Sequence, residues 1–158
     1  VLALRAEIEA TGPEGRRLIA ADDFFLDLYE TALAPGELLT AIHVPLPPES
    51  RLFGFDEIAR RRGDYAMVGV AAQADVAGGV IADASVTLFS VGFTPVRAKA
   101  AEQALDGAPL SPESIARAQA ALAQNLDPPE DPGFPPERRL QLARVLLGRV
   151  LSRMEPVK

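Results

Sequence analysis

Residues 67–91 read MVGVAAQADVAGGVIADASVTLFSV, and this stretch decides the fold of the larger part of the chain. Its first half, Met67–Val76, is rich in small and β-branched residues, which favour a β-strand. Gly78 and Gly79 follow, and paired glycines suit the tight turn of a hairpin. The second half, Val80–Val91, is again rich in apolar and β-branched residues. The stretch therefore predicts two antiparallel strands joined by a short turn.

A third strand is expected on the N-terminal side of this hairpin. Phe53–Arg61 carries apolar residues at strand-like spacing, and Arg62-Gly63-Asp64 forms a turn or bulge before the next strand. Connections this short join neighbouring antiparallel strands. The three segments together predict an antiparallel meander.

Beyond Val91 the apolar spacing changes from period two to period 3.6, which predicts helices. Thr94 is expected to cap the first helix with Pro95 at its first position, and Ser111 is expected to cap the second. The predicted helices cover Pro95–Leu105, Ser111–Leu126 and Pro136–Met154. The fold class expected here is α+β: a three-stranded antiparallel sheet packed by about three helices.

The N-terminal residues predict a second, smaller α+β region. Because prolines cannot donate to a strand ladder, Pro45, Pro47 and Pro48 end its last strand. We therefore divide the chain into residues 1–48 and 49–158. Since the chain begins inside a predicted strand, we expect it to be part of a longer protein. The expected elements are a strand over Val1–Thr11, a returning strand over Arg16–Ala20, a short helix capped by Asp22 or Asp23 and running through Tyr29, and a strand over Glu37–Val44.

Composition removes several classes of protein. The chain of 158 residues has no Cys and one His, His43. Disulfides, cysteine-ligated zinc, iron–sulfur clusters held by this chain, a thiol nucleophile and a His-rich metal site are therefore excluded. A net charge of −6 argues against a nucleic-acid binder. No apolar run approaches the roughly 20 residues of a membrane span. Lack of Cys and of an export signal favours a cytoplasmic protein.

Standard catalytic and phosphate-binding motifs are absent from the sequence. It contains no Gly-Lys-Ser/Thr loop, no Gly-x-Gly-x-x-Gly and no His-Glu-x-x-His. The acidic pairs Asp22-Asp23 and Glu130-Asp131 are expected to cap helices or to lie in solvated loops. His43 is expected to have a structural or surface role. We predict no catalytic residue and no metal ligand in this chain.

The most unusual segment is Arg60-Arg-Arg-Gly-Asp-Tyr-Ala66. Three basic residues in an acidic protein make a local positive site, and arginine binds phosphate or carboxylate with two parallel hydrogen bonds. Tyr65 adds a flat face with a polar tip. One interpretation is a solvated basic hairpin with a packing tyrosine. The other is a lip over a planar, anionic ligand.

Several strings, taken in order along most of the chain, resemble the medium, flavin-binding subunit of molybdenum hydroxylases. This family includes the medium subunit of carbon monoxide dehydrogenase and the flavin domain of xanthine dehydrogenase. The strings that carry the resemblance are Ala20-Ala-Asp-Asp-Phe-Phe, Tyr29-Glu-Thr-Ala-Leu, Pro35-Gly-Glu-Leu-Leu-Thr-Ala-Ile, Val44-Pro, Ala59-Arg-Arg-Arg-Gly-Asp-Tyr-Ala-Met-Val and Val91-Gly-Phe-Thr-Pro-Val-Arg-Ala.

The resemblance implies a domain organisation. Residues 1–48 would be the C-terminal remnant of an FAD-binding domain, and residues 49–158 a carbon monoxide dehydrogenase flavoprotein-like C-terminal domain. The Gly-rich loops that hold the FAD pyrophosphate in this family are absent here. Glu137-Arg-Arg stands where relatives often have an aromatic residue before a basic pair.

The resemblance also implies a role in electron transfer. A large subunit with the molybdenum cofactor oxidises the substrate, and 2Fe-2S clusters in a small subunit relay electrons to FAD, which reduces an external acceptor. In this chain Thr40 and Ile42 lie in a strand that resembles one touching the flavin. Tyr65 would lie near the reactive edge of the ring, and Arg61 and Asp64 would set the electric field beside it.

Two alternatives remain open from the sequence. The chain could be an interaction or assembly module that does not itself bind flavin, which the missing Gly-rich loops favour. It could also be a free-standing α+β protein that binds a small molecule. The substrate of the holoenzyme and its final electron acceptor are not readable from these residues.

Overall fold

The C-terminal lobe (residues 49–156) is built on an antiparallel sheet with the strand order β10-β6-β7-β8-β9. The computed structural model describes residues 1–156 of the chain. Three long strands form the body of this sheet, which confirms the predicted antiparallel meander, and a two-residue strand extends it at each edge. The strands are β6 (Arg51–Ala59), β7 (Ala66–Ala77), β8 (Val80–Phe89), β9 (Val96–Arg97) and β10 (Glu155–Pro156).

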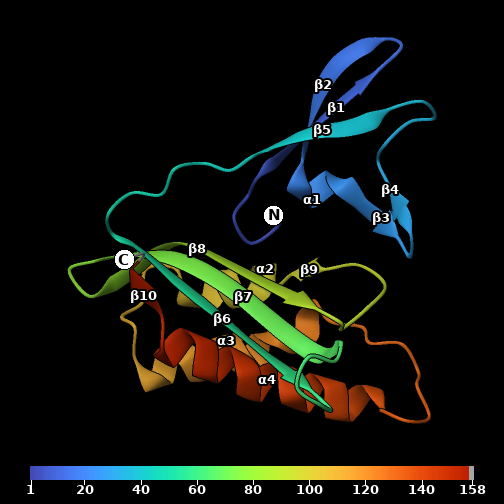
Figure 1. Cartoon of the computed structure of the whole chain (residues 1–158). Coiled ribbons are helices and arrows are strands. Elements are labelled where there is room, and N and C mark those ends of the chain that lie inside the picture. The colour runs from blue at the N-terminus through green and yellow to red at the C-terminus, as the bar shows by residue number, and fades with distance from the viewer. Residues whose placement is uncertain (157–158) are drawn as a thin grey trace.

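One face of this sheet carries the main hydrophobic core. Along β7, Val68 and Val70 are buried in that core, and along β8, Val86 and Leu88 join them. Side chains alternate between the two faces of a strand, so the residues between them point away from the core. Figure 1 shows helices α2, α3 and α4 on one side of the sheet and the N-terminal residues on the other.

The helices follow the order expected from the sequence. Ser111 caps α3: its side chain accepts a hydrogen bond from the Ser114 backbone N–H, while Ser114 Oγ accepts one from the Ser111 N–H. Gly54 lets α4 lie close to β6, because a Cβ at this position would come within 2.7 Å of Val150 Cγ1. The helices are α2 (Lys99–Leu105), α3 (Pro112–Ala121), the 3-10 turn η1 (Leu122–Gln124) and α4 (Pro136–Ser152).

The first predicted helix starts later than expected. Instead of a helix from Pro95, the residues Val96 and Arg97 form β9, which pairs with Leu88 and Thr87 of β8. The residue that precedes α2 is therefore Ala98 rather than Thr94. These two residues pair with the free edge of β8 instead of starting the helix, so the prediction of a helix beginning at Pro95 is wrong.

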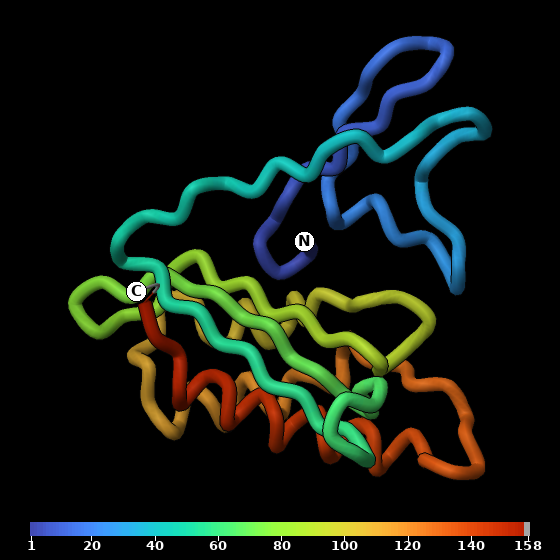
Figure 2. The backbone as a smooth tube through the Cα atoms, in the orientation of Figure 1, coloured from blue at the N-terminus to red at the C-terminus, as the bar shows by residue number. Residues whose placement is uncertain are grey.

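The N-terminal lobe (residues 1–48) holds a separate small sheet with the order β2-β1-β5. A second apolar cluster, which includes Ile8, Ile19 and Phe24, lies against this sheet. Figure 2 shows the chain leaving β5, running along one side of the molecule and entering β6. The elements are β1 (Glu7–Gly12), β2 (Gly15–Ala20), α1 (Ala21–Phe24), β3 (Phe25–Asp27), β4 (Glu30–Thr31) and β5 (Leu38–His43).

Two predictions for this lobe need correction. The strand predicted over Val1–Thr11 begins only at Glu7, because the preceding residues turn so that Leu2 is buried. The helix predicted to run through Tyr29 ends at Phe24, because β3 turns back to pair with β4. Neither aspartate caps it, since its N-cap residue is Ala20. Across residues 1–156, we find no helix with both the length and the apolar character to cross a membrane.

Candidate functional site

The turn between β6 and β7 projects a tyrosine into solvent. Gly63 takes a left-handed φ of 80°, and the Asp64 N–H donates to the Arg61 carbonyl at 3.1 Å. The Asp64 carboxylate then accepts the Tyr65 N–H at 2.9 Å. These bonds hold the backbone of the turn while the Tyr65 side chain stays 95% exposed. A tyrosine that packs under the hairpin is therefore excluded, and the lip described from the sequence is geometrically available.

A pocket of about 300 Å³ opens beside this turn. Its floor holds Phe134, with the Arg139 guanidinium 5.0 Å from the ring centroid. Arg139 Nη1 donates to the Ser90 carbonyl at 3.3 Å, and Nη2 donates to the Asp131 carboxylate at 3.4 Å. Pockets of this size hold small molecules in many proteins. The lining residues are Arg60, Asp64, Tyr65, Ala66, Met67, Ser90, Asp131, Phe134 and Arg139.

Only part of this pocket was predicted from the sequence. Tyr65 and Asp64 line it, whereas Arg61 is exposed and Arg60 takes the lining position. Asp131 lies in a loop with its side chain 45% exposed, as expected, and it also pairs with Arg139. The departure at Glu137-Arg-Arg, whose last residue is Arg139, was the available signal for this part of the site. Phe134 and Ser90 carried no signal in the sequence.

Thr40 and Ile42 lie elsewhere, on β5 of the small sheet. Thr40 Oγ1 donates to the Glu9 carboxylate at 2.9 Å, and Ile42 is 47% exposed. His43 also contacts Glu9, with Nε2 at 3.1 Å from Oε2, and so takes the surface role expected for it. The hydrogen bonds from His43 and then Thr40 hold the pKa of Glu9 below its ordinary value. The Glu9 carboxylate thus keeps its charge and fixes the Thr40 hydroxyl.

The structure does not bring the two groups of predicted site residues into contact. Thr40 and Ile42 belong to the small sheet, whereas Arg61, Asp64 and Tyr65 belong to a turn of the large one. Figure 1 shows the small sheet at the top of the molecule and the β6–β7 turn at its lower right. A ligand that met both groups would have to extend between the lobes.

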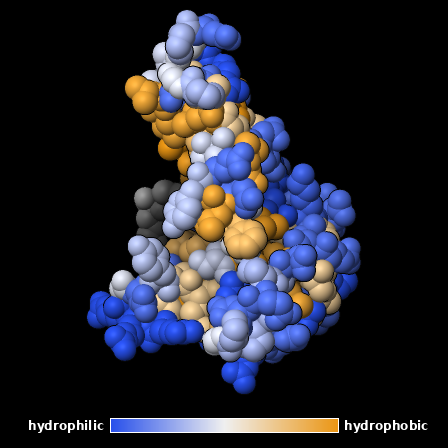
Figure 3. Space-filling model, turned by 90° about the vertical axis from the view of Figure 1, so that its right-hand side faces the viewer, coloured by the Kyte–Doolittle hydropathy of each residue, from blue (hydrophilic) through white to orange (hydrophobic). Residues whose placement is uncertain are grey.

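The N-terminal lobe leaves many apolar side chains in solvent. Ile42, on β5 of the small sheet, is one of them, and Figure 3 shows hydrophobic residues gathered on this upper part of the molecule. Apolar side chains left in solvent in such number are typical of a surface that a ligand or another protein covers. The exposed apolar residues of the lobe are Val1, Leu18, Leu26, Leu28, Tyr29, Leu38, Leu39, Ile42, Val44 and Leu46.

Two family descriptions match consecutive parts of the chain. Residues 1–47 match the FAD binding domain in molybdopterin dehydrogenase. Residues 53–154 match the CO dehydrogenase flavoprotein C-terminal domain. The second match alone covers more than half of the described residues.

Known proteins resemble the chain over nearly its whole length. The carbon monoxide dehydrogenase medium chain of Afipia carboxidovorans is 38% identical over 150 residues, which are 95% of this chain and 52% of that protein. The nicotine 6-hydroxylase medium subunit of Paenarthrobacter nicotinovorans is 34% identical over 96% of this chain and 53% of its own length. The chain spans about half the length of these curated relatives.

Solved structures share the fold. The crystal structure of the Cu,Mo-CO dehydrogenase in its cyanide-inactivated form superimposes with a TM-score of 0.90 at 38% identity, covering 96% of this chain and 53% of that one. Quinoline 2-oxidoreductase from Pseudomonas putida 86 gives 0.85 at 32% identity, with the same coverage of 96% and 53%. The chain therefore belongs to the family of FAD-binding medium subunits of the molybdenum hydroxylases, and its second half is a CO dehydrogenase flavoprotein C-terminal domain.

Proposed function

We propose that this chain forms the ring-side part of the FAD site in the flavoprotein subunit of a multi-subunit molybdenum hydroxylase. The observation that carries the proposal is Tyr65, which is 95% exposed on a turn held by its own backbone hydrogen bonds and stands beside a pocket of about 300 Å³. An aromatic side chain that packs against nothing in its own chain is available to cover a planar ligand.

The residues present fit one end of FAD and not the other. The exposed faces of Tyr65 and Ile42 suit an aromatic ring system, and Arg61 and Asp64 would tune the charge beside it. A pyrophosphate needs backbone N–H groups at a glycine-rich turn or helix start. Within residues 1–156, no helix follows such a turn: the residues before the four α-helices are Ala20, Ala98, Ser111 and Pro135.

The phosphate contacts would then come from the half of the relatives' length that this chain does not span. FAD would supply the redox chemistry, receiving electrons from iron–sulfur clusters and passing them to an external acceptor. The residues of this chain would hold and orient the flavin ring, and none of them acts as acid, base or nucleophile. The Thr40 hydroxyl is oriented by the hydrogen bond that it donates to the Glu9 carboxylate at 2.9 Å.

The complete enzyme would contain two partner subunits, and this chain would consist of two domains. A large subunit with the molybdenum cofactor and a small subunit with 2Fe-2S clusters would complete the enzyme, in the cytoplasm. The separate apolar clusters of the two lobes support a division near residues 48 and 49, where the proline-rich link runs from β5 to β6.

The test is Tyr65→Ala in the full-length subunit loaded with FAD. Because Tyr65 is almost fully exposed, we expect the free energy of unfolding of the variant to stay within about 0.5 kcal/mol of the wild-type value. We expect the rate of flavin reoxidation or the flavin reduction potential to change. Tyr29→Ala is the matched control, since Tyr29 is the other tyrosine of the chain and is 100% exposed. Lost stability with unchanged reoxidation would reject the role at the flavin.

A second candidate function is an assembly module that binds no flavin. The exposed apolar side chains of the N-terminal lobe favour it, because such surface commonly docks another protein. The two candidates separate on one measurement: a full-length subunit that binds the partner subunits but takes up no FAD supports the assembly module.

A further inference from the structure

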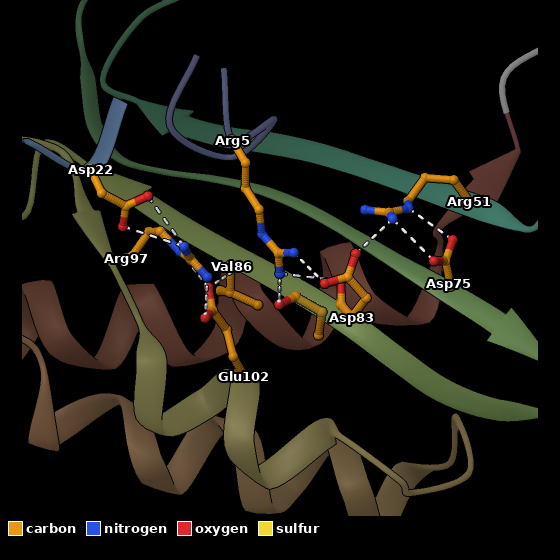
Figure 4. A network of polar contacts seen from close by, with 9 residues as sticks. Arg5, Asp22, Arg51, Asp75, Asp83, Val86, Arg97 and Glu102 are labelled. Atoms are coloured by element: carbon orange, nitrogen blue, oxygen red, sulfur yellow. Dashed lines mark hydrogen bonds and ion pairs between the residues drawn. The ribbon is translucent and has the colours of Figure 1, made fainter. Parts of the chain in front are cut away.

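The two lobes have separate apolar cores. The clusters around Val86 and around Ile8 share no residue. Across residues 1–156, no strand pairing joins one lobe to the other, since the three sheets each lie within one lobe. Besides the covalent link from β5 to β6, the lobes are connected by polar contacts of two arginines, Arg5 and Arg97, drawn in Figure 4.

The first contact links the N-terminal turn to the start of β8. Arg5 Nη1 pairs with the Asp83 carboxylate, and Arg5 Nη2 donates to the Ala84 carbonyl at 2.9 Å. Both partners have left-handed backbones, with φ of 51° at Arg5 and 50° at Asp83. Aspartate tolerates this conformation, but arginine adopts it at a cost in free energy, so surrounding contacts must hold it. The pairing with Asp83 is such a contact.

Asp83 is itself fixed by a second arginine. Arg51 Nη2 donates to the other Asp83 oxygen at 2.7 Å, while Arg51 is anchored on Asp75 by bonds of 2.8 and 3.0 Å. The Arg51 side chain is only 10% exposed. Burial by itself raises the pKa of Asp83, but the bonds and charges of Arg5 and Arg51 outweigh it and leave that pKa below its ordinary value. Asp83 is therefore a fixed anion that faces the other lobe.

The second contact has the same design with opposite charges. Arg97 donates to Glu102 from Nε at 3.0 Å and from Nη2 at 2.6 Å, and Glu102 also accepts the Val86 N–H at 2.8 Å. The remaining nitrogen, Nη1, donates to both Asp22 oxygens at 3.3 Å. A guanidinium held by two bonds has a fixed plane, so it presents its third edge in one direction. Asp22, in the first turn of α1, meets that edge.

We propose that Asp83 and Arg97 are positioning residues that, through Arg5 and Asp22, fix the N-terminal lobe over the large sheet and so set where β5 lies relative to Tyr65. The inference rests on the proposed function, because Thr40 and Ile42 on β5 and Tyr65 on the β6–β7 turn are the two sides of the proposed FAD site. Two separated contacts, each anchored in the large lobe, restrain both the distance and the rotation of the small one.

The test measures the separation of the lobes directly. Because the chain has no native Cys, Glu14→Cys and Ala77→Cys place two spin labels at exposed positions, one in each lobe, for electron–electron double resonance on the whole chain. The variant is Asp83→Asn combined with Asp22→Asn. Asp56→Asn is the control, since Asp56 pairs with Arg149 inside the large lobe at 3.9 Å. Asp22→Glu keeps the carboxylate and serves as the conservative variant.

We expect one narrow distance in the wild type, the control and Asp22→Glu, and its loss to a broad distribution in the double variant. In the complete FAD-loaded subunit, the same double variant should shift the visible absorption band or the reduction potential of the flavin. An unchanged distance distribution would overturn the inference, as would a broadened one with an unchanged flavin. A wild-type subunit that takes up no FAD would overturn the proposed function, and the distances would then report on the lobes alone.

Discussion

Both lobes combine an antiparallel sheet with α-helix, and they differ in how much of the sheet the helices cover. In the C-terminal lobe, three helices close one face of the sheet, and residues such as Leu88 and Leu147 are fully buried. In the N-terminal lobe, a four-residue helix, α1, is the only α-helix between residues 1 and 48. Long apolar side chains such as Leu38 therefore stay in solvent. The large lobe therefore buries most of its long apolar side chains within itself, whereas the small lobe leaves many of its own uncovered.

The uncovered small lobe has its greatest expected consequence for cofactor affinity. We expect this chain alone to bind FAD weakly or not at all, because the pyrophosphate needs backbone amides at close range and the net charge of −6 repels it. Flavin fluorescence during titration of the chain with FAD measures the affinity. Tight, saturable binding at ordinary salt would mean that the small lobe holds the phosphates without help.

The second effect is on folding stability. Leu147→Ala empties a fully buried position of α4 and should cost about 2–5 kcal/mol. Leu38→Ala is the matched substitution in the small lobe, where the side chain is 71% exposed, and should cost about 0.5 kcal/mol or less. Urea unfolding of both variants gives the comparison. Equal costs would show that Leu38 is part of a core and would remove the contrast between the lobes.

A third, smaller effect tests the open face of the large sheet. The Phe89 ring covers Gly69 across the strand pair and stacks on Phe55 with centroids 6.0 Å apart. Gly69→Ala should displace the ring and cost about 1–3 kcal/mol. Phe89→Ala in the same molecule makes room for the methyl group, so the two substitutions should cost less together than their sum. Additive costs in urea unfolding would place the strain elsewhere.

The smallest effect concerns an ion pair inside the small lobe. Glu37 accepts two bonds from Arg17 at 2.8 Å and one from the Ala34 N–H at 2.6 Å. The Arg17 bond and then the Ala34 bond lower the pKa of Glu37 from 4.5 to about 2. A depressed carboxylate pKa stabilises the fold above the unfolded value and loses that contribution as pH falls through the folded one.

The stability difference between wild type and Glu37→Gln should therefore be constant above about pH 5 and shrink between pH 4.5 and about 2. Urea unfolding of both proteins across this range measures it. A difference that did not depend on pH would mean that Glu37 acts through its shape and not through its charge.

The sequence predicted best what local patterns specify. The small and β-branched residues of β7, the glycine pair at Gly78 and the Ser111 cap are short-range signals, and each matches the structure. The fold class followed from these elements. Val96 and Arg97 were misassigned because their strand depends on a free edge of β8.

The candidate site was predictable only where the chain itself makes a turn. Asp64 and Tyr65 are neighbours, and their exposure follows from the Gly63 turn. The remaining wall comes from distant segments: Arg139 reaches the carbonyl of Ser90 and the carboxylate of Asp131. Such contacts depend on how α4 lies on the sheet, and no local spacing in the sequence reports it.

The order β2-β1-β5 leaves the outer edges of β2 and β5 without a partner strand in the described residues. The β5 edge, Leu38–His43, has the sequence LLTAIH, which contains no aspartate, glutamate, lysine or arginine. Unpaired backbone groups beside apolar side chains form a template on which another chain adds a strand. The chain handled alone will thus self-associate with rising concentration, and lysine at Leu38, whose side chain is 71% exposed, is the substitution that would keep it dispersed.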